Sequence, residues 1–482
     1  MLKTLKNAWR TPELRKKLLF TLLIIVIYRL GANIPVPYID AEQLKSVSDN
    51  FGGTILQFLN MLSGEALGKA TLFALGVSPY ITSSIVMQLL TIAIPALERL
   101  SKNGEEGRKK ITAITRFVTV ALALVTSIGY LMYLESVGIF VSTGKDGGGL
   151  YFFQKVIIVA CYCAGAALVM WLAEKINDHG IGNGISMILF ANIIAGAYSM
   201  LSSLWYTVFP TGSASSFKWQ GLLVAIGVIA LFLGFILLVV WMSDAERRIP
   251  IQYAKRVVGR KMYGGQNTNL PIKVNMTGVM PIIFANSIVS LPATIASFFG
   301  TAENGFTKFM TNLINGSWGF VNNIENTTVK TVVQSLISFN YNGWLYLVIL
   351  LALLIAFAYF YVAISFNPVE VANNIKNNGG AIPGIRSGKP TVEYIKKVLN
   401  RITLVGALIV AFIACFPLLL NIVCGYVDTA LVSASKSALF GQSLLTLAFS
   451  GSSIMIVVGV ALETVRELEA QLSLRNYKGF LD

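Results

Sequence analysis

The chain has 482 residues, of which 55% are hydrophobic and 13% charged, with a formal net charge of +15. Its mean hydropathy of +0.68 excludes a soluble globular protein, which needs a largely polar surface, and indicates a polytopic membrane protein. The four cysteines lie in or at the ends of apolar runs without the spacing of metal ligands. We therefore interpret them as packing residues and expect neither a metal nor a cofactor.

Apolar runs long enough to cross a bilayer recur along the chain. A hydrocarbon core of about 30 Å needs about 20 apolar residues in an α-helix, and on this basis the sequence predicts ten spans. Their approximate ranges are 18–34, 75–97, 117–134, 153–173, 184–203, 221–242, 274–299, 343–366, 402–427 and 440–462. An even number of spans places both termini on the same side of the membrane.

Basic residues gather in the terminal segments and in the loops of one side. These segments include the long loops 244–273 and 367–401, and together they contain 29 of the 38 Lys and Arg but 14 of the 23 Asp and Glu. The whole net charge therefore lies on one face. Because Lys and Arg accumulate in cytoplasmic loops, we expect this face and both termini to be cytoplasmic.

The ten predicted spans divide into two sets of five at the loop around residue 210. Residues 1–210 form the predicted N-terminal half, and residues 211–482 form the C-terminal half. An odd number of spans in each half requires the second half to enter the membrane inverted relative to the first. Inverted halves with a cavity between them suit either a channel or an alternating-access transporter.

Side chains that could drive transport or catalysis are scarce in the predicted spans. The spans contain no carboxylate and no histidine, Arg29 lies near the outer end of the first span, and His179 falls in a short polar turn. Ion-coupled carriers and membrane-embedded enzymes usually hold such groups within their spans. The sequence also lacks a phosphate-binding Gly-Lys-Ser/Thr loop. We therefore expect no enzyme activity, and we expect a partner to supply energy.

A short apolar stretch flanked by glycines occupies residues 51–64. Its helical part, residues 54–62, is about 14 Å long at 1.5 Å per residue, which is about half of a bilayer core. A helix of this length cannot span the membrane. It is either an interfacial or re-entrant segment, the default interpretation, or a mobile stopper in a cavity, because irregular backbone at membrane depth survives only where protein or water surrounds it.

The two long loops on the predicted cytoplasmic face place basic residues among apolar residues and turns. Attraction to anionic lipid is the simpler interpretation of such loops. Each loop has about 30 residues, however, which is more than a connection requires and favours docking of a motor protein or of a ribosome with its RNA. Arg386 lies in a Gly/Pro turn that can present a side chain rigidly. The candidate docking residues are Arg247, Arg248, Lys255, Arg256, Arg260, Lys261, Arg386 and Lys389.

Several motifs follow one another in order along nearly the whole chain. They are Leu75-Gly-Val-Ser-Pro-Tyr-Ile81, Gly182-Asn-Gly-Ile-Ser186, Asp244-Ala-Glu-Arg-Arg-Ile-Pro250, Tyr253-Ala-Lys-Arg256, Leu270-Pro-Ile-Lys-Val-Asn-Met276, Gly278-Val-Met-Pro281, Phe366-Asn-Pro-Val-Glu370 and Pro383-Gly-Ile-Arg386. This series resembles the SecY family, the channel subunits of the bacterial Sec protein translocon. The resemblance extends from about Leu14 to Gly479, and the order of the motifs makes it specific.

The resemblance implies an all-α integral membrane protein with ten helices around a central pore and residues 51–64 as a plug that closes it from the outer side. The implied plug residues are Thr54, Ile55, Leu56, Phe58, Leu59, Met61 and Leu62. The implied constriction is a ring of Val77, Ile81, Ile185, Leu189, Ile283 and Ile456, with Ile454 competing for the last position. Each of these residues alone would ordinarily be a packing contact. Together, branched aliphatic side chains offer water no hydrogen bond, so a narrow ring of them resists leakage.

The resemblance also implies how the channel works and with which partners. The seam between the second and third spans and the seventh and eighth is the implied lateral gate, and Arg386 is the residue that engages the SecA motor ATPase. Further implied partners are SecE-like and SecG-like membrane subunits, the ribosome with its rRNA, signal peptides, nascent polypeptides and anionic lipids. We therefore expect a passive protein-conducting channel, for secretory polypeptides and membrane segments, in the bacterial cytoplasmic membrane. The alternative is an inverted-repeat secondary transporter of a small solute.

Overall fold

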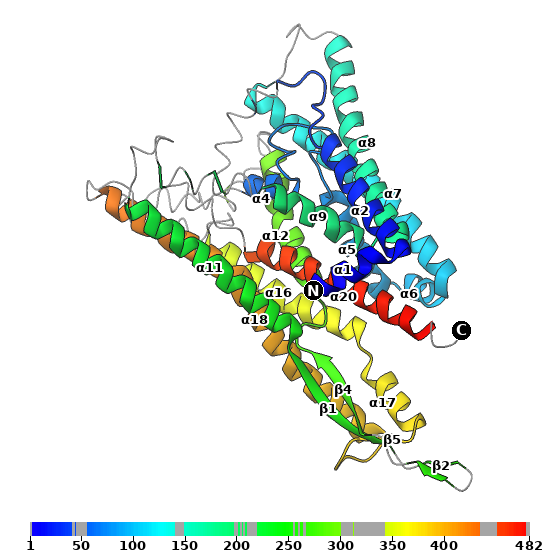
Figure 1. The fold of residues 1–482 in the computed structure, drawn as a ribbon. Helices are drawn as coiled ribbons and strands as arrows, with labels where there is room; N and C mark the ends of the chain where they lie inside the picture. Colours follow the sequence, from blue (N-terminus) through cyan, green and yellow to red (C-terminus); the bar gives the residue numbers. More distant parts are fainter. Residues whose placement is uncertain are drawn as a thin grey trace.

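Helices make up most of the structure, with a small sheet projecting from one end (Figure 1). The computed structural model describes residues 2–40, 44, 55–139, 149–196, 201, 202, 205, 208, 209, 219–253, 256–258, 261–263, 267–299, 312, 343–433 and 451–478. The helices before residue 200 are α1 (Leu2–Arg10), α2 (Pro12–Gly31), α4 (Ile55–Leu62), α5 (Ser78–Ala93), α6 (Pro95–Lys102), α7 (Gly104–Val137), α8 (Gly149–His179) and α9 (Gly184–Ala195). The later helices are α11 (Trp219–Asp244), α12 (Met280–Phe299), α16 (Trp344–Ser365), α17 (Pro368–Asn377), α18 (Lys389–Ser433) and α20 (Gly451–Lys478).

Each of the ten predicted spans overlaps one of these helices. Within the described residues, α7, α8, α11, α16 and α18 are long and apolar enough to cross a membrane, and the pair α5–α6 makes a sixth span if it is counted as one. The apolar helix α9 is shorter, at 12 residues. The membrane fold is therefore confirmed, whereas the count of ten spans stays a prediction.

The second predicted span differs most from its expected form. It was expected to run to residue 97, but α5 ends at Ala93 and α6 leaves it at an angle of 101°. The cause is Pro95, which disfavours helical backbone at the residue before it. Ile94 accordingly adopts an extended conformation, with φ −107° and ψ 113°.

The predicted loop 244–273 is not an irregular connection, as an all-α fold would require, but forms strands. β1 (Glu246–Tyr253) pairs antiparallel with β4 (Asn267–Lys273), and β2 (Arg256–Val258) pairs with β3 (Lys261–Tyr263) between them. Ile249 and Ile251 are buried, whereas the residues on either side of each are exposed. This alternation has the period of two that is typical of a strand with one buried face.

The main hydrophobic core joins the two predicted halves. It collects buried side chains of α2, α5, α8 and α9 from the first half and of α11, α12, α16, α18 and α20 from the second. α4 lies at the centre of the bundle and contacts both α9 and α12 (Figure 1). Separate, smaller clusters lie within the first half and beneath the sheet. The division at residue 210 therefore separates sequence segments that share one core.

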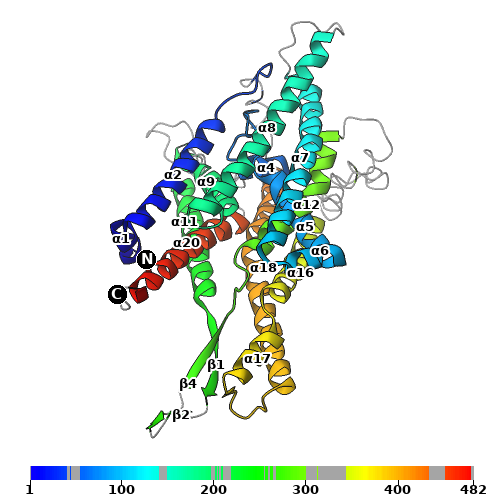
Figure 2. The ribbon, with the colours of Figure 1, turned by 90° about the vertical axis from the view of Figure 1, so that its right-hand side faces the viewer.

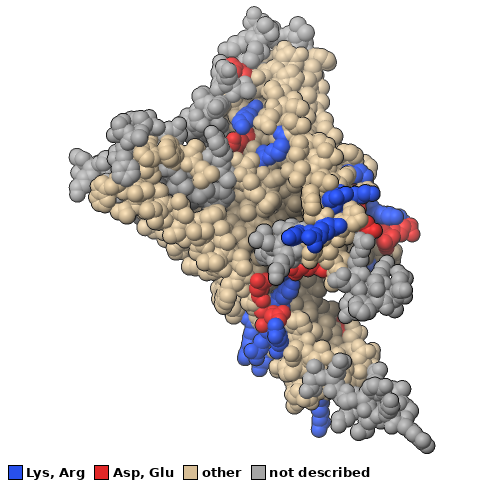
Figure 3. Space-filling model, viewed as in Figure 1, with Lys and Arg blue, Asp and Glu red and all other residues tan. Residues whose placement is uncertain are grey.

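Both ends of the described chain lie on the same side of the bundle. α1 packs against α20, and Figure 2 shows the N- and C-terminal ends next to each other. Charged side chains gather around this end and along the sheet, whereas α11 presents a largely uncharged surface (Figure 3). Among the large exposed apolar side chains of α11 are Leu223, Leu237 and Trp241, which suits a lipid-facing helix.

Candidate pore and docking surface

The short helix α4 covers most of the stretch predicted to be a plug. Thr54 lies outside the described residues, as do the side chains of Ile55, Leu56 and Phe58, although these three belong to α4. Met61 and Leu62 pack against the main core, and Leu59 packs against the first-half cluster. The described side of α4 therefore faces the interior of the bundle.

Most of the predicted ring residues come together in the core from four helices. Ile81, Leu189, Ile283 and Ile456 are each at most 5% exposed, and all four line one cavity of about 90 Å³. Val77 is buried in the same core cluster, and the half-buried Ile185 packs against it, but neither belongs to the described lining of the cavity. Ile456 lines the cavity, whereas its competitor Ile454 is buried beside it.

The cavity connects the ring to the plug. Leu59 and Leu62 of α4 form part of its wall, so the plug and the four ring residues enclose the same space. A second part of the wall is polar, because Asn286, Ser287 and Ser290 reach it from α12. Apolar cavities of this size stay dry, whereas polar groups can hold water. The cavity therefore has an apolar side, formed in part by the predicted ring residues, and a polar side where α12 meets α5 and α7.

The seam between α5, α7, α12 and α16 corresponds to the predicted lateral gate. α12 contacts α5, α7 and α16 along this seam. The hydroxyl of Tyr361 on α16 donates a hydrogen bond of 2.7 Å to Oε1 of Gln88 on α5. This bond joins residues 273 positions apart and lies between helices of the two predicted halves.

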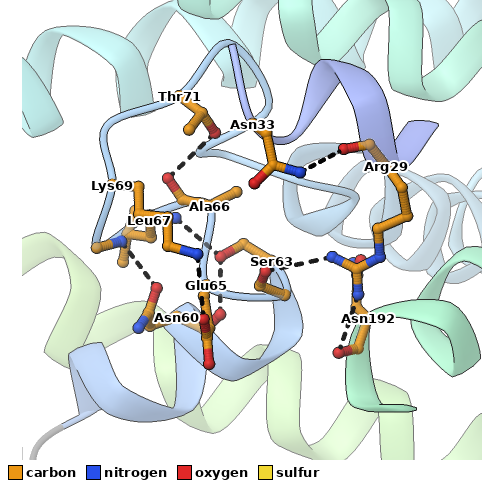
Figure 4. A network of polar contacts seen from close by, with 12 residues as sticks. Arg29, Asn33, Asn60, Ser63, Glu65, Ala66, Leu67, Lys69, Thr71 and Asn192 are labelled. Carbon is orange, nitrogen blue, oxygen red and sulfur yellow. Dashed lines mark hydrogen bonds and ion pairs between the residues drawn. The ribbon is translucent and has the colours of Figure 1, made fainter. Parts of the chain in front are cut away.

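A polar network surrounds the C-terminal end of α4 (Figure 4). Arg29 of α2 donates to the carbonyl oxygens of Gly64 at 3.3 Å and Ala191 at 2.6 Å. Nδ2 of Asn192 on α9 donates to the carbonyl oxygen of Leu62 at 2.7 Å. Arg29 was noted in the sequence as a charge within a span, but Asn192 was not. A single amide in an otherwise apolar helix was its only signal.

The two predicted docking loops meet in one sheet. β5 (Gly380–Ala381) pairs antiparallel with β1, through Gln252 opposite Ala381 and Tyr253 opposite Gly380, which gives the strand order β4-β1-β5. α17 begins after Asn367, whose side chain accepts hydrogen bonds from two backbone N–H groups of its first turn. Figures 1 and 2 both show the sheet and α17 projecting together from the bundle.

The described docking residues are exposed on this projection. Arg247 and Arg248 lie on β1, Arg386 lies in the turn after β5, and Lys389 begins α18. Lys255 and Arg260 lie outside the described residues. Arg256 and Lys261 belong to β2 and β3, but their side chains are not among those described.

A side-chain hydrogen bond and two glycines hold the turn that carries Arg386. The Arg386 carbonyl oxygen accepts a hydrogen bond of 2.9 Å from the hydroxyl of Thr391. Gly384 and Gly388 on either side have φ of +79° and +111°, which side chains disfavour. The turn therefore fixes the backbone and leaves the guanidinium of Arg386 in solvent.

The basic residues of this face differ in whether a nearby carboxylate is paired with them. Arg248 is partly neutralised by Glu246, with 2.6 Å between Nε and Oε1. Arg116, at the start of the third predicted span, is paired with Glu174 of α8. Nε of Arg116 donates a hydrogen bond of 2.9 Å to Oε1 of Glu174. Charges that hold helices together are thus distinct from exposed charges such as Arg386.

Comparison with known proteins places the whole chain in one family. The family model SecY matches residues 71–465. The chain is 42% identical over 487 residues to a protein translocase subunit SecY of Streptomyces galbus, and 39% identical over 487 residues to one of Mycobacterium bovis. In both cases the alignment covers 100% of this chain and of the relative.

Solved structures share the fold. A protein-conducting channel has a TM-score of 0.55 at 17% identity, and the match covers 94% of this chain and 92% of that one. Sec61 from a canine ribosome-channel complex matches with a TM-score of 0.52 at 18% identity, with the same coverage. The SecY relatives that match over their full length are protein translocase subunits, which decides between the two alternatives left open by the inverted halves. The chain belongs to the SecY family of protein translocase channel subunits.

Proposed function

We propose that this protein forms a passive channel whose closed state is sealed by the ring Val77, Ile81, Ile185, Leu189, Ile283 and Ile456 and by the plug helix α4. The supporting observation is the shared cavity, because Leu59 and Leu62 of α4 face the same space as four ring residues. Aliphatic walls give water no hydrogen bonds, so a narrow passage between them tends to empty and blocks ions. The same non-directional walls can fit a passing polypeptide of any sequence.

The pore lies between the halves 1–210 and 211–482 in this proposal. The ring draws Val77, Ile81 and Leu189 from the first half and Ile283 and Ile456 from the second, and these five side chains are buried in one core cluster. Separating the halves would widen the passage along its axis. Opening the seam between α5 and α12 would give a membrane segment access to lipid.

The projecting sheet is the proposed docking surface for a partner on the cytoplasmic side. It supports Arg247 and Arg386 on one rigid platform, because β1 pairs with β5 across the two loops. The solved neighbours include Sec61 in a ribosome-channel complex and a yeast Ssh1 complex bound to the 80S ribosome. We infer that a ribosome with its rRNA, or the SecA motor ATPase, binds here by charge complementarity.

We also propose that the chain resides in the bacterial cytoplasmic membrane with both termini in the cytoplasm. The basic sheet and the two adjacent terminal helices lie at the same end of the bundle, and Lys and Arg favour the cytoplasmic side. SecE-like and SecG-like subunits are the proposed membrane partners, and anionic lipids would contact the basic rim. Signal peptides and nascent polypeptides are the proposed cargo.

A reversible tether tests whether α4 gates the channel. Ser453 Oγ on α20 lies 3.8 Å from Met61 Sδ on α4, so the pair M61C and S453C places two thiols close together. The four native cysteines are first replaced by alanine. Under oxidising conditions the tether should block polypeptide passage in proteoliposomes, and reduction should restore it. Each single cysteine variant is the control, and equal passage by the oxidised and reduced double variant would refute the gating role of α4.

A further inference from the structure

The plug helix α4 ends in a motif in which backbone N–H groups after the helix donate to carbonyl oxygens of its last turn. The N–H of Glu65 donates to the Asn60 carbonyl at 2.8 Å, and the N–H of Gly64 donates to the Met61 carbonyl at 3.0 Å. With Gly64 at φ +68°, this is the pattern of a Schellman motif. The carbonyl oxygens of Leu62 and Gly64 point away from the helix and take donors from other parts of the chain.

Asn192 supplies the donor to Leu62. Its side chain is 0% exposed, and Nδ2 donates to the Leu62 carbonyl oxygen at 2.7 Å and to the Tyr28 hydroxyl at 2.9 Å. Both amide hydrogens are therefore engaged. An amide buried at this depth in a membrane protein is costly unless it is bonded, so the bond to the plug satisfies a donor that would otherwise be unpaired.

Arg29 supplies the donor to Gly64 and ties the plug to two helices. It extends from α2, donates to the Gly64 carbonyl at 3.3 Å, and donates to the carbonyl oxygens of Ala191 and Asn192 at 2.6 and 3.4 Å. These carbonyls lie at the C-terminal ends of α4 and α9, where the helix dipoles are negative. The guanidinium thus bridges two helix ends that would otherwise repel each other (Figure 4).

The fit at this point leaves no room for a side chain on the plug. A Cβ atom added at Gly64 would lie 2.7 Å from Arg29 Nη1 and 2.8 Å from Asn192 Oδ1. Both distances are shorter than normal contacts. A Cβ atom at this position would therefore displace the ends of the Arg29 and Asn192 side chains.

These contacts differ in kind from the apolar contacts of the plug. Leu59 and Leu62 can slide past aliphatic neighbours with gradual loss of contact, whereas a hydrogen bond is lost within about 1 Å. When the plug leaves, Nη1 of Arg29 and one N–H of the Asn192 amide lose their acceptors on the plug until water enters the pore. Release of these bonds is therefore a discrete event coupled to hydration of the channel.

We propose that Arg29 and Asn192 are positioning residues that latch the C-terminal end of the plug in the closed channel and are released on opening. This inference rests on the proposed gating role of α4. In the closed channel, two polar side chains from α2 and α9 then hold the plug in place, in addition to the apolar contacts of α4.

The first test measures ion leak through the purified, complete translocon in proteoliposomes without cargo. N192L keeps the approximate volume of the side chain and removes the donor to Leu62, so leak should rise about tenfold. R29M should raise leak further, because bonds from a charged donor are stronger. R29K keeps the charge and should restore much of the seal. N33A is the matched control, because Asn33 donates to the Arg29 carbonyl from an exposed position away from the plug and should leave leak unchanged.

A second variant changes the plug residue that contacts Arg29 and Asn192. G64A introduces a Cβ between Arg29 and Asn192 and should raise leak like N192L, while the Leu59 and Leu62 contacts remain. Monodisperse elution of each complex and unchanged protease resistance show that the variant has folded. Leak at the wild-type level in folded N192L, R29M and G64A would overturn the latch.

A double-variant cycle separates the latch from the gating role of α4. Deletion of residues 55–64 should raise leak on its own, and N192L in the deleted protein should add nothing, because its partner is gone. An equal further increase from N192L in the deleted protein would overturn the latch but leave the plug intact as a gate. A deletion that does not raise leak would instead overturn the proposed plug itself.

Discussion

The centre of the bundle and the projecting sheet, which are the proposed pore and the proposed docking surface, are built from different kinds of contact. At the centre, aliphatic side chains from α5, α9, α12 and α20 share a cavity with the plug, and their contacts have no preferred direction. In the sheet, paired backbone groups and two glycines with positive φ fix the turn that carries Arg386. A channel for diverse polypeptides needs a tolerant passage, whereas a partner that delivers force needs a fixed platform.

The largest effect is expected from a substitution that disrupts the sheet and leaves the helical bundle intact. Ile251 of β1 is 4% exposed within the cluster beneath the sheet, so I251D would bury an unpaired charge and destabilise this region by about 4 kcal/mol or more. We expect motor-driven export to fall by about a hundredfold. Hydrogen exchange should increase in β1, β4 and β5 but not in α5, α9 or α12.

Q252D places the same charge at the exposed neighbouring position of β1 and is the matched control. It should leave both exchange and export near the wild-type values. Increased exchange throughout the bundle in I251D would show that the platform and the channel do not fold as separate clusters.

Reversal of a charge on the intact platform should have the next largest effect. R386E replaces an exposed cation in a fixed turn with an anion, and a like charge opposite an acidic partner surface opposes association. We expect motor-driven export to fall at least about tenfold at low salt, with insertion of the channel unchanged. The measurement is ATP-dependent export into inverted vesicles over a range of salt concentrations.

Lys389 provides the comparison for Arg386, because it is exposed at the start of α18 in the same loop. K389E should weaken export less if the rigid turn, rather than basic charge in general, guides the partner. Equal losses for R386E and K389E would favour a diffuse electrostatic attraction, and normal export by R386E would remove Arg386 from the docking surface.

The two regions also differ in how far the sequence predicts them. Hydropathy located a helix for every predicted span, and the family resemblance placed four ring residues that prove to share one cavity. The sheet was missed even though Ile249 and Ile251 alternate with exposed residues, because Pro250 within this five-residue run argues against a strand. The pairing of β1 with β5 joins segments more than 100 residues apart, which no local pattern shows.

The hydrogen bonds around the C-terminal end of α4 could not be predicted either, because they also join segments that are far apart in the sequence. Arg29 and Ala191 are 162 positions apart, and Asn192 and Leu62 are 130 positions apart. Local composition reveals that a polar side chain is unusual in a span, but its acceptor depends on how α2, α4 and α9 meet. The sharp bend at Ile94, in contrast, could have been predicted from Pro95 alone.

A polar substitution in the ring tests whether the passage is sealed because its apolar wall excludes water. I283N introduces an amide into the shared cavity, where hydration of the polar group is favoured by about 1–3 kcal/mol over the apolar side chain. We expect resting ion conductance to rise about ten- to a hundredfold in planar bilayers. I283V keeps the wall apolar and should leave conductance nearly unchanged, and a similar rise for both variants would mean that packing, not dewetting, makes the seal.

The smallest expected effect concerns the hydrogen bond between Tyr361 and Gln88, which crosses the seam. Y361F removes the hydroxyl that donates to Gln88 at 2.7 Å but keeps the ring packed against Phe284 and Phe360. A single hydrogen bond contributes about 0.5–1.5 kcal/mol, so release of a membrane segment into lipid should become about two- to tenfold more favourable. Q88L should have a similar effect, and the double variant should add little to either, because both changes remove the same bond. Additive effects would place the two side chains in separate contacts, and the seam would then be held, like the ring, by apolar packing alone.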